Sequence, residues 1–392
     1  MANGELAQRS GTTAEPLARA SAPPGAALRT GLAARVRTTP SVDPAFSLDV
    51  DFSAPTGFTI LFGASGAGKT TLLNCVAGLI TPDSGTIAVG ERVFFDAQSR
   101  INLPVAQRRV GYVFQNLALF PHFTVQANVA YGLDRIGAQE RKRRVASVLE
   151  AFRIAPLATR RPREISGGER QRVALARSLV TDPCILLLDE PLAALDQPTK
   201  SRILDDLRVW NEAHRIPILY VTHSRDEVFA LGEQVLVLDH GRMVVQGTPH
   251  QVMGAPRQET VAQLAGFENI YDAVVEASHE DRGTMTCRLA QSKVSLETPL
   301  VNARVGSVLR IAIRAGDILL ATHPPEGLSA RNVLPGRVAG LIQKDVIVAA
   351  RVDCGVRLEV HLTLAARDAL QLAPGREVWL VVKTHSCHLM AV

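Results

Sequence analysis

The chain has 392 residues, 46% of them hydrophobic, and a formal net charge of +5. This length accommodates two or three domains of ~100–200 residues, and no apolar run approaches the ~18 residues of a membrane-spanning helix. The mild positive charge, with no visible platform of basic and aromatic residues, does not indicate a nucleic-acid partner. The five cysteines are scattered without CxxC spacing, so we expect a reducing compartment and no disulfide framework.

The hydrophobic pattern and the composition change along the chain and divide it into segments. Residues 1–40 show no apolar periodicity, and we expect a disordered extension. Residues 41–265 alternate continuous apolar runs with amphipathic segments, which predicts an α/β domain whose parallel sheet is covered on both faces. A helical subdomain is expected within it at about 115–165. Short β-branched runs separated by Gly and Pro then predict a β-rich linking segment at 266–327 and a small all-β barrel at 328–392.

A phosphate-binding loop follows the apolar run 58–62. Its sequence matches G-x-x-x-x-G-K-[ST] and opens a helix, where backbone N–H groups and the helix N-terminus can surround phosphate oxygens. Lys69 would reach the β- and γ-phosphates, and the hydroxyl of Thr70 would bind Mg²⁺. The residues expected to bind ATP are Gly63, Ala64, Ser65, Gly66, Ala67, Gly68, Lys69, Thr70 and Thr71.

Two adjacent carboxylates end another apolar run, at 185–189. Open α/β folds bind their ligands at this carboxyl edge of the sheet. We therefore expect Asp189 to hold Mg²⁺, and Glu190 to orient and polarise the attacking water as general base.

Two adjacent glycines, Gly167 and Gly168, lie at the start of another predicted helix. Ser166 is a suitable N-cap for it, and Gly167, Gly168 and Glu169 follow. The peptide from Ile165 to Arg172 resembles the signature of ATP-binding cassette (ABC) proteins, although Leu is commoner at its first position and Gln at the position of Glu169. In that family the signature presents its hydroxyl, bare N–H groups and helix dipole to the γ-phosphate held by another subunit.

The resemblance to ABC ATPases covers about residues 46–253 and implies further roles. Gln115 resembles the Q-loop glutamine, which contacts Mg²⁺ or the attacking water, and Asp196 lies in a peptide that resembles the D-loop crossing the dimer. His223 resembles the switch histidine that contacts the γ-phosphate. An aromatic residue ahead of the phosphate loop usually stacks on adenine, and Phe46 is our candidate. The fold implied is a P-loop NTPase of ABC type.

A dimer follows from the arrangement of these motifs. The chain has one phosphate loop and one signature, so a single copy cannot supply both halves of a closed site. We expect a homodimer with two-fold symmetry.

The C-terminal segment resembles a molybdate-binding (Mop) module, an OB-like barrel. The resemblance begins at residues 329–336 and continues to Lys383. A tetrahedral dianion suits hydroxyl, backbone N–H and cationic donors, so Ser329, Arg331 and Lys383 are the candidate oxyanion residues. Otherwise these residues only shape the barrel.

ABC ATPases with one such module resemble the ATP-binding subunit of the bacterial molybdate importer. That resemblance implies a peripheral protein on the cytoplasmic face of the bacterial inner membrane, with two copies of an integral-membrane permease and, indirectly, a periplasmic oxyanion-binding protein. Alternatives are an importer for tungstate, sulfate, thiosulfate or another small solute, a soluble cassette acting on ribosomes or DNA, and a molybdate-sensing binding protein.

Overall fold

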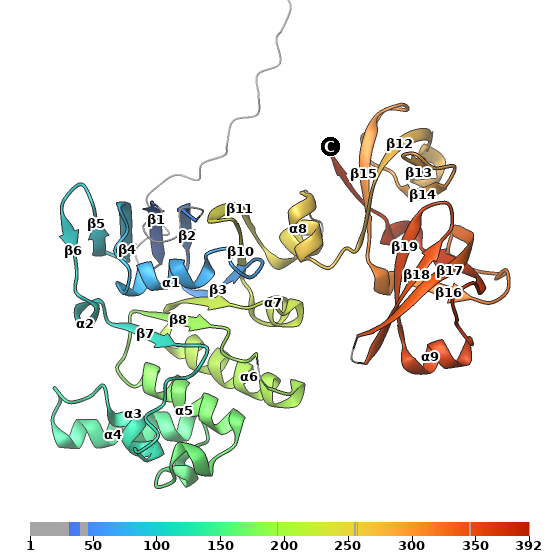
Figure 1. Ribbon diagram of the computed structural model, residues 1–392. Helices are drawn as coiled ribbons and strands as arrows, with labels where there is room; N and C mark the ends of the chain where they lie inside the picture. Colours follow the sequence, from blue (N-terminus) through green and yellow to red (C-terminus); the bar gives the residue numbers. More distant parts are fainter. Residues whose placement is uncertain are drawn as a thin grey trace, which may run out of the picture.

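The computed structural model describes residues 31–39, 46–193, 195–254, 256, 258–344 and 346–391. The N-terminal domain is organised by one sheet with the strand order β6-β5-β4-β1-β2-β11-β10-β3-β9-β8-β7 (Figure 1). Its strands are β1 (Leu32–Thr38), β2 (Leu48–Ala54), β3 (Gly57–Phe62), β4 (Ser84–Val89), β5 (Arg92–Asp96), β6 (Ile101–Asn102), β7 (Val110–Val113), β8 (Ile185–Asp189), β9 (Pro217–Val221), β10 (Gln234–Asp239) and β11 (Arg242–Gly247).

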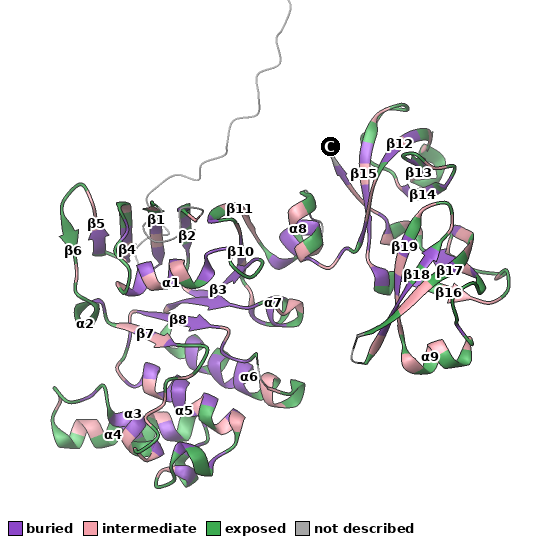
Figure 2. Cartoon of the chain, viewed as in Figure 1, coloured by how far each residue is buried: buried purple, intermediate pink, exposed green. Residues whose placement is uncertain are grey.

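The half of the sheet from β10 to β7 is parallel, as the apolar runs predict. Strands β3, β8 and β9 are buried at every position, because both of their faces are covered (Figure 2). The other half, from β6 to β2, pairs antiparallel, which the apolar pattern did not predict. The predicted P-loop NTPase fold is confirmed.

The predicted N-terminal extension is wrong for residues 32–38. These residues form β1, which pairs with β2 on one side and β4 on the other. Leu32, Ala34 and Val36 point into the core at every second position, as in a half-buried strand. This alternation covers only seven residues and is flanked by polar residues, so the sequence analysis did not detect it. Residues 1–30 and 40 of that predicted extension lie outside the described residues.

Helices cover both faces of the sheet, and the sheet separates the hydrophobic core of the domain into two clusters. In β3, Phe58, Ile60 and Phe62 belong to one hydrophobic cluster, whereas Leu61 belongs to the other, on the side of α1. The helices of this domain are α1 (Lys69–Ala77), α2 (Val105–Arg108), α3 (Val125–Ala130), α4 (Ala138–Ala151), α5 (Gly167–Leu179), α6 (Gln197–His214), α7 (Arg225–Leu231) and α8 (Glu259–Leu264), with short turns at Ala155–Leu157, Pro162–Glu164 and His250–Gly254. No helix in the part of the chain described here is long and apolar enough to span a membrane.

A buried arginine anchors the C-terminal end of α1. The guanidinium of Arg108 donates hydrogen bonds to the carbonyl oxygens of Cys75 and Val76, both at 2.9 Å, and to that of Leu103 at 2.9 Å. Its positive charge therefore meets the negative end of the helix dipole and satisfies carbonyls without a partner inside the helix. This contact fixes the helix whose other end is the phosphate loop.

The C-terminal region consists of two antiparallel sheets of five strands, in the orders β14-β13-β12-β15-β21 and β16-β20-β17-β18-β19. The edge strands of each sheet contact one another, β14 with β21 and β16 with β19, so each sheet curls into a barrel. The strands are β12 (Asn269–His279), β13 (Thr284–Leu289), β14 (Ser295–Pro299), β15 (Val308–Ile313), β16 (Ile318–Ala321), β17 (Asn332–Lys344), β18 (Ile347–Asp353), β19 (Arg357–Thr363), β20 (Glu377–Val382) and β21 (His388–Ala391), with α9 (Leu364–Ala369) after β19.

Each barrel is completed by a strand from the other half of the region. Strand β16 pairs with β20, and β21 pairs with β15. We predicted a β-rich linking segment at residues 266–327, and this prediction is wrong, because these residues form most of a barrel of their own. Both halves run through four strands, a short helical turn (Ala315–Asp317 or Thr384–Ser386) and an exchanged strand, which is the pattern of an internal duplication.

Two buried asparagines join the barrels at equivalent places. Asn269, the first residue of β12, donates to the carbonyl of Glu359 at 2.8 Å and accepts from its backbone N–H at 2.7 Å. Asn332, the first residue of β17, makes the same pair of bonds to Glu297, at 2.9 and 2.6 Å. Each amide thus acts as a substitute strand partner for one residue of the opposite barrel.

Candidate nucleotide site

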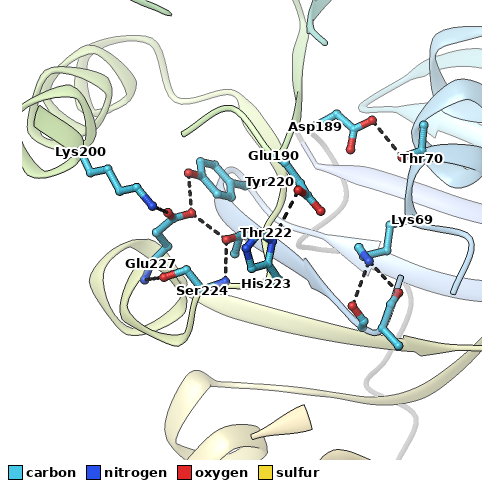
Figure 3. A network of polar contacts seen from close by, with 12 residues as sticks. Lys69, Thr70, Asp189, Glu190, Lys200, Tyr220, Thr222, His223, Ser224 and Glu227 are labelled. Atoms are coloured by element: carbon cyan, nitrogen blue, oxygen red, sulfur yellow. Dashed lines mark hydrogen bonds and ion pairs between the residues drawn. The ribbon is translucent and has the colours of Figure 1, made fainter. Parts of the chain in front are cut away.

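The phosphate loop places a buried cation at the edge of the sheet. Lys69, the first residue of α1, donates from Nζ to the carbonyl oxygens of Gly63 at 2.9 Å and Ala64 at 2.8 Å (Figure 3). Burial lowers the pKa of Lys69, and the nearby carboxylates of Glu190 and Asp189 oppose that effect. The ammonium is therefore held above the loop at a place where a polyphosphate would remove its desolvation cost.

The end of the loop requires glycine for two reasons. Gly68 has a φ of 101°, a conformation that other residues rarely adopt. A Cβ atom there would also lie 2.7 Å from Cζ of Phe46. The ring of Phe46 therefore packs directly against the loop, on the wall of the site.

The oxygen donors predicted for Mg²⁺ lie together. The hydroxyl of Thr70 donates to Oδ2 of Asp189 at 2.9 Å, between the start of α1 and the end of β8. Burial raises the pKa of Asp189, and the hydrogen bond from Thr70 acts against that shift. Among the described residues no group of three or more His, Cys, Asp or Glu side chains could hold a metal by itself. A hydroxyl and one carboxylate fit Mg²⁺, which usually completes its octahedron with phosphates and water.

The residue after Asp189 turns the chain sharply. Glu190 has a φ of 46°, and its N–H donates to the carbonyl of Val221 at 3.1 Å. Its Oε2 lies 3.5 Å from Nδ1 of His223, which follows the end of β9 (Figure 3). The imidazole is 66% exposed and the carboxylate 23%, so both groups can be reached from solvent.

These groups share one pocket of about 650 Å³. Of the predicted site residues, the pocket wall contains Phe46, Gly63, Ser65, Gly66, Gly68, Lys69, Thr70, Thr71, Gln115, Asp189, Glu190 and His223. Ala64 contributes the carbonyl that holds Lys69, and Ala67 is buried in the core beneath the loop.

The loop after Gln115 is fastened to the helix that follows the signature. Arg177 on α5 donates to the carbonyl oxygens of Leu117 at 2.8 Å and Ala118 at 2.7 Å. Both of these residues have positive φ, at 59° and 44°, so the loop folds tightly around the guanidinium. The position of Gln115 is thereby coupled to α5.

The signature residues line a different pocket, of about 590 Å³. Ser166 caps α5, because its Oγ accepts from the N–H of Glu169 at 3.3 Å while the Glu169 carboxylate accepts from the N–H of Ser166 at 2.7 Å. Gly167, Gly168 and Asp196 lie in the same wall, and Asp196 caps α6 through Thr199. The two pockets share no residue, so the two candidate half-sites are separate on this chain.

The surroundings of the two signature glycines differ. A Cβ on Gly168 would lie 2.6 Å from Cγ2 of Thr199, so its smallness permits close packing against α6. A Cβ on Gly167 would meet only ordinary contacts, the nearest being Cδ2 of Leu195 at 3.5 Å. The fold of this copy therefore does not require glycine at position 167, and the bare backbone there is available to a ligand.

Three arginines also line the signature pocket: Arg153 and Arg202, which were missed from the sequence, and Arg172, which ends the signature peptide but was not predicted as a site residue. Arg153 and Arg172 both pair with the buried carboxylate of Asp206, at 3.2 and 2.8 Å. These pairs join residues 53 and 34 positions apart, so no local pattern could reveal them.

The candidate oxyanion residues are all exposed. The strand register pairs Asn332 with Val382, which places Arg331 and Lys383 opposite each other one step beyond the ladder. Ser329 precedes them on the loop that leads into β17.

Comparison with known proteins finds two matching families. The family described as ABC transporter matches residues 48–193, and the family described as TOBE domain matches residues 328–389. Among solved structures, a dimeric bacterial ABC transporter cassette is 27% identical, with a TM-score of 0.48, over 56% of this chain and 98% of that one.

The relatives define the class more narrowly. The molybdenum import ATP-binding protein ModC of Rhizobium meliloti (strain 1021) is 40% identical over 348 residues, which covers 86% of this chain and 95% of that protein. Its counterpart in Paramagnetospirillum magneticum is 40% identical over 340 residues, covering 86% and 93%. The chain therefore belongs to the ModC family of ABC transporter ATP-binding proteins.

Proposed function

We propose that this protein hydrolyses ATP to energise the import of molybdate through a membrane permease. The separation of the phosphate-loop pocket from the signature pocket carries the proposal, because a complete site needs two copies. The names of the relatives, which are molybdenum import ATP-binding proteins, support the choice of cargo.

In the proposed cycle, residues 63–71 hold the phosphates of ATP, and Phe46 stacks on the adenine. Thr70, Asp189 and Gln115 would hold Mg²⁺, which supplies neutralisation of phosphate charge when bound. Glu190 accepts the proton of the attacking water, and His223 donates to a γ-phosphate oxygen.

The partner copy supplies Ser166, Gly167, Gly168 and Glu169 to the same γ-phosphate, and Asp196 lies at the seam. ATP binds the closed pair better than the open pair, so binding shifts the population toward closure. Hydrolysis removes the bridging phosphate and reopens the dimer, and two docked permease subunits follow this motion. We place the protein at the cytoplasmic face of the bacterial inner membrane, with a periplasmic oxyanion-binding protein acting indirectly.

In this proposal the C-terminal barrels sense the transported oxyanion at Ser329, Arg331 and Lys383. Arg331 and Lys383 are opposed across the strand register, and two cations and a hydroxyl are suitable donors for a tetrahedral dianion. Tungstate, sulfate and thiosulfate offer similar oxygens, so the same residues leave those cargoes as alternatives.

Uptake by membrane vesicles that contain the protein and its permease tests the proposal. We expect ATP-dependent accumulation of molybdate that a tenfold excess of sulfate reduces by less than half, an order-of-magnitude expectation for a site that selects between oxyanions. Accumulation of sulfate in preference to molybdate would replace the cargo while leaving the ATPase assignment intact. Absence of any ATP-dependent uptake of these oxyanions would reject the transport function itself.

A further inference from the structure

We propose that Glu227 and Lys200 are positioning residues that couple the His223 loop to the Asp196 segment, so that both respond together when the nucleotide site closes. The inference rests on the proposed ATPase function and adds a mechanical connection inside each copy. Neither residue lines the nucleotide pocket or the signature pocket.

Glu227 is a carboxylate buried under the His223 loop. It lies in the first turn of α7, is 5% exposed, and receives hydrogen bonds at both oxygens. Oε2 accepts from the hydroxyls of Tyr220 at 2.9 Å and Thr222 at 2.7 Å, and Oε1 accepts from Nζ of Lys200 at 3.2 Å (Figure 3). A buried charge requires this degree of pairing to be tolerated.

Glu227 contacts both neighbours of His223, one through its carboxylate and the other through its backbone N–H. Thr222 is bound through its hydroxyl, which in turn accepts from the N–H of Ser224 at 3.0 Å. Ser224 caps α7, because its Oγ accepts from the N–H of Glu227 at 3.4 Å. The imidazole itself is mostly exposed and lies 3.5 Å from Glu190, so the backbone of this loop largely determines its place.

Lys200 extends the network to the D-loop segment. It lies one turn into α6, where its N–H donates to the carbonyl of Asp196 at 3.0 Å. Its side chain is 16% exposed, and its ammonium pairs with Glu227 across 27 residues of sequence. A displacement of Asp196 by the partner copy would therefore be transmitted through Lys200 and Glu227 to both flanks of His223.

An ordinary structural role explains this carboxylate poorly. An acidic residue in the first turn favours the helix dipole of α7, but the exposed Asp226 already supplies that charge. Burying a second carboxylate with a lysine costs desolvation and often yields no net stability. Burial, followed by the effect of Glu227, raises the pKa of Tyr220 well above its usual range, so the phenol remains a donor to the carboxylate. A charged network retained at this cost fits a connection between moving parts.

The test compares steady-state ATP hydrolysis by the full-length wild type, Lys200→Met, Glu227→Gln, the double variant and Lys200→Arg. We expect kcat to fall about tenfold in each single variant, the size usual for loss of a partner behind a functional group, while the KM for ATP stays unchanged. The double variant should be no slower than the slower single variant, because both remove one connection. Lys200→Arg should restore most of the wild-type rate.

Arg208→Met is the matched control. Arg208 lies two turns further along α6. Within the described residues its one ion pair is with the exposed carboxylate of Asp205, at 3.6 Å, so turnover should be unaffected. If Glu227→Gln fails to fold, Lys200→Met and its rescue by arginine decide the question alone.

Unchanged kcat in Lys200→Met, a parallel rise in KM, or multiplied losses in the double variant would each overturn the coupling. Those results would leave the proposed function standing as long as the wild type hydrolyses ATP. A wild type without ATP hydrolysis would instead overturn the proposed function.

Discussion

Glu190 and His223 illustrate how backbone geometry places single side chains. Because Glu190 has a left-handed backbone conformation, its side chain and that of Asp189 point in different directions. The carboxylate of Asp189 contacts Thr70, and the carboxylate of Glu190 contacts His223. In the proposed mechanism this division gives adjacent acids different tasks, metal binding for one and proton transfer for the other, although both lie at the end of one strand.

Replacement of Glu190 by glutamine tests the proton-transfer role. Gln keeps the size and a hydrogen-bonding group but cannot accept a proton, so we expect kcat to fall by about 10²–10⁴-fold. Binding of ATP should change little, because Lys69 and the loop remain. Equilibrium dialysis with labelled ATP, beside single-turnover hydrolysis, measures the two properties separately. Turnover at the wild-type rate would exclude Glu190 as the base.

At the scale of elements, the sequence predicted what depends on local pattern. The phosphate loop, its strand and its helix all lie within residues 57–77, and the phosphate loop and the signature each contain their own glycines and N-cap residue. Strand β1 was missed because its partners begin 10 and 46 residues after it ends, at Leu48 and Ser84. The exchange of β16 and β21 was missed for the same physical reason, since strand pairing at long range leaves no periodic signal in a short segment.

The equivalent asparagines of the two barrels provide a prediction for the duplicated elements. Asn269→Ala and Asn332→Ala each remove two hydrogen bonds to the part-buried backbone of the opposite barrel, one to an N–H and one to a carbonyl. We expect each to lower the free energy of unfolding of the C-terminal region by about 1–3 kcal/mol.

Urea unfolding followed by tryptophan fluorescence, to which Trp379 on β20 contributes beside Trp210 on α6, measures this loss. Asn302→Ala, in the exposed loop before β15, is the control and should stay within about 0.5 kcal/mol of the wild type. Midpoints of all three variants equal to that of the wild type would show that these amides do not join the barrels.

At the scale of the whole molecule, one copy carries two incomplete sites facing different parts of its surface. The sheet places Lys69, Asp189 and Glu190 at its carboxyl edge, whereas α5 and α6 begin at the signature pocket. The sequence alone predicted this division, because it depends only on having one of each motif. The sequence could not predict the arginines around Asp206 or the Lys200–Glu227 pair, which arise from the packing of helices distant in sequence.

Mixing two inactive variants tests the shared site most directly. Lys69→Ala removes the phosphate-loop cation, and Gly167→Asp adds a carboxylate at the signature, where the fold has room for a Cβ atom. Neither homodimer then contains an intact site, but a mixed dimer contains one: the phosphate loop of the Gly167→Asp copy facing the signature of the Lys69→Ala copy. We predict that each variant alone is inactive and that an equal mixture recovers ATP hydrolysis, up to roughly a quarter of the wild-type rate if copies pair at random and the two sites act independently. A mixture as inactive as its components, or full activity of Gly167→Asp by itself, would contradict a site built from two copies.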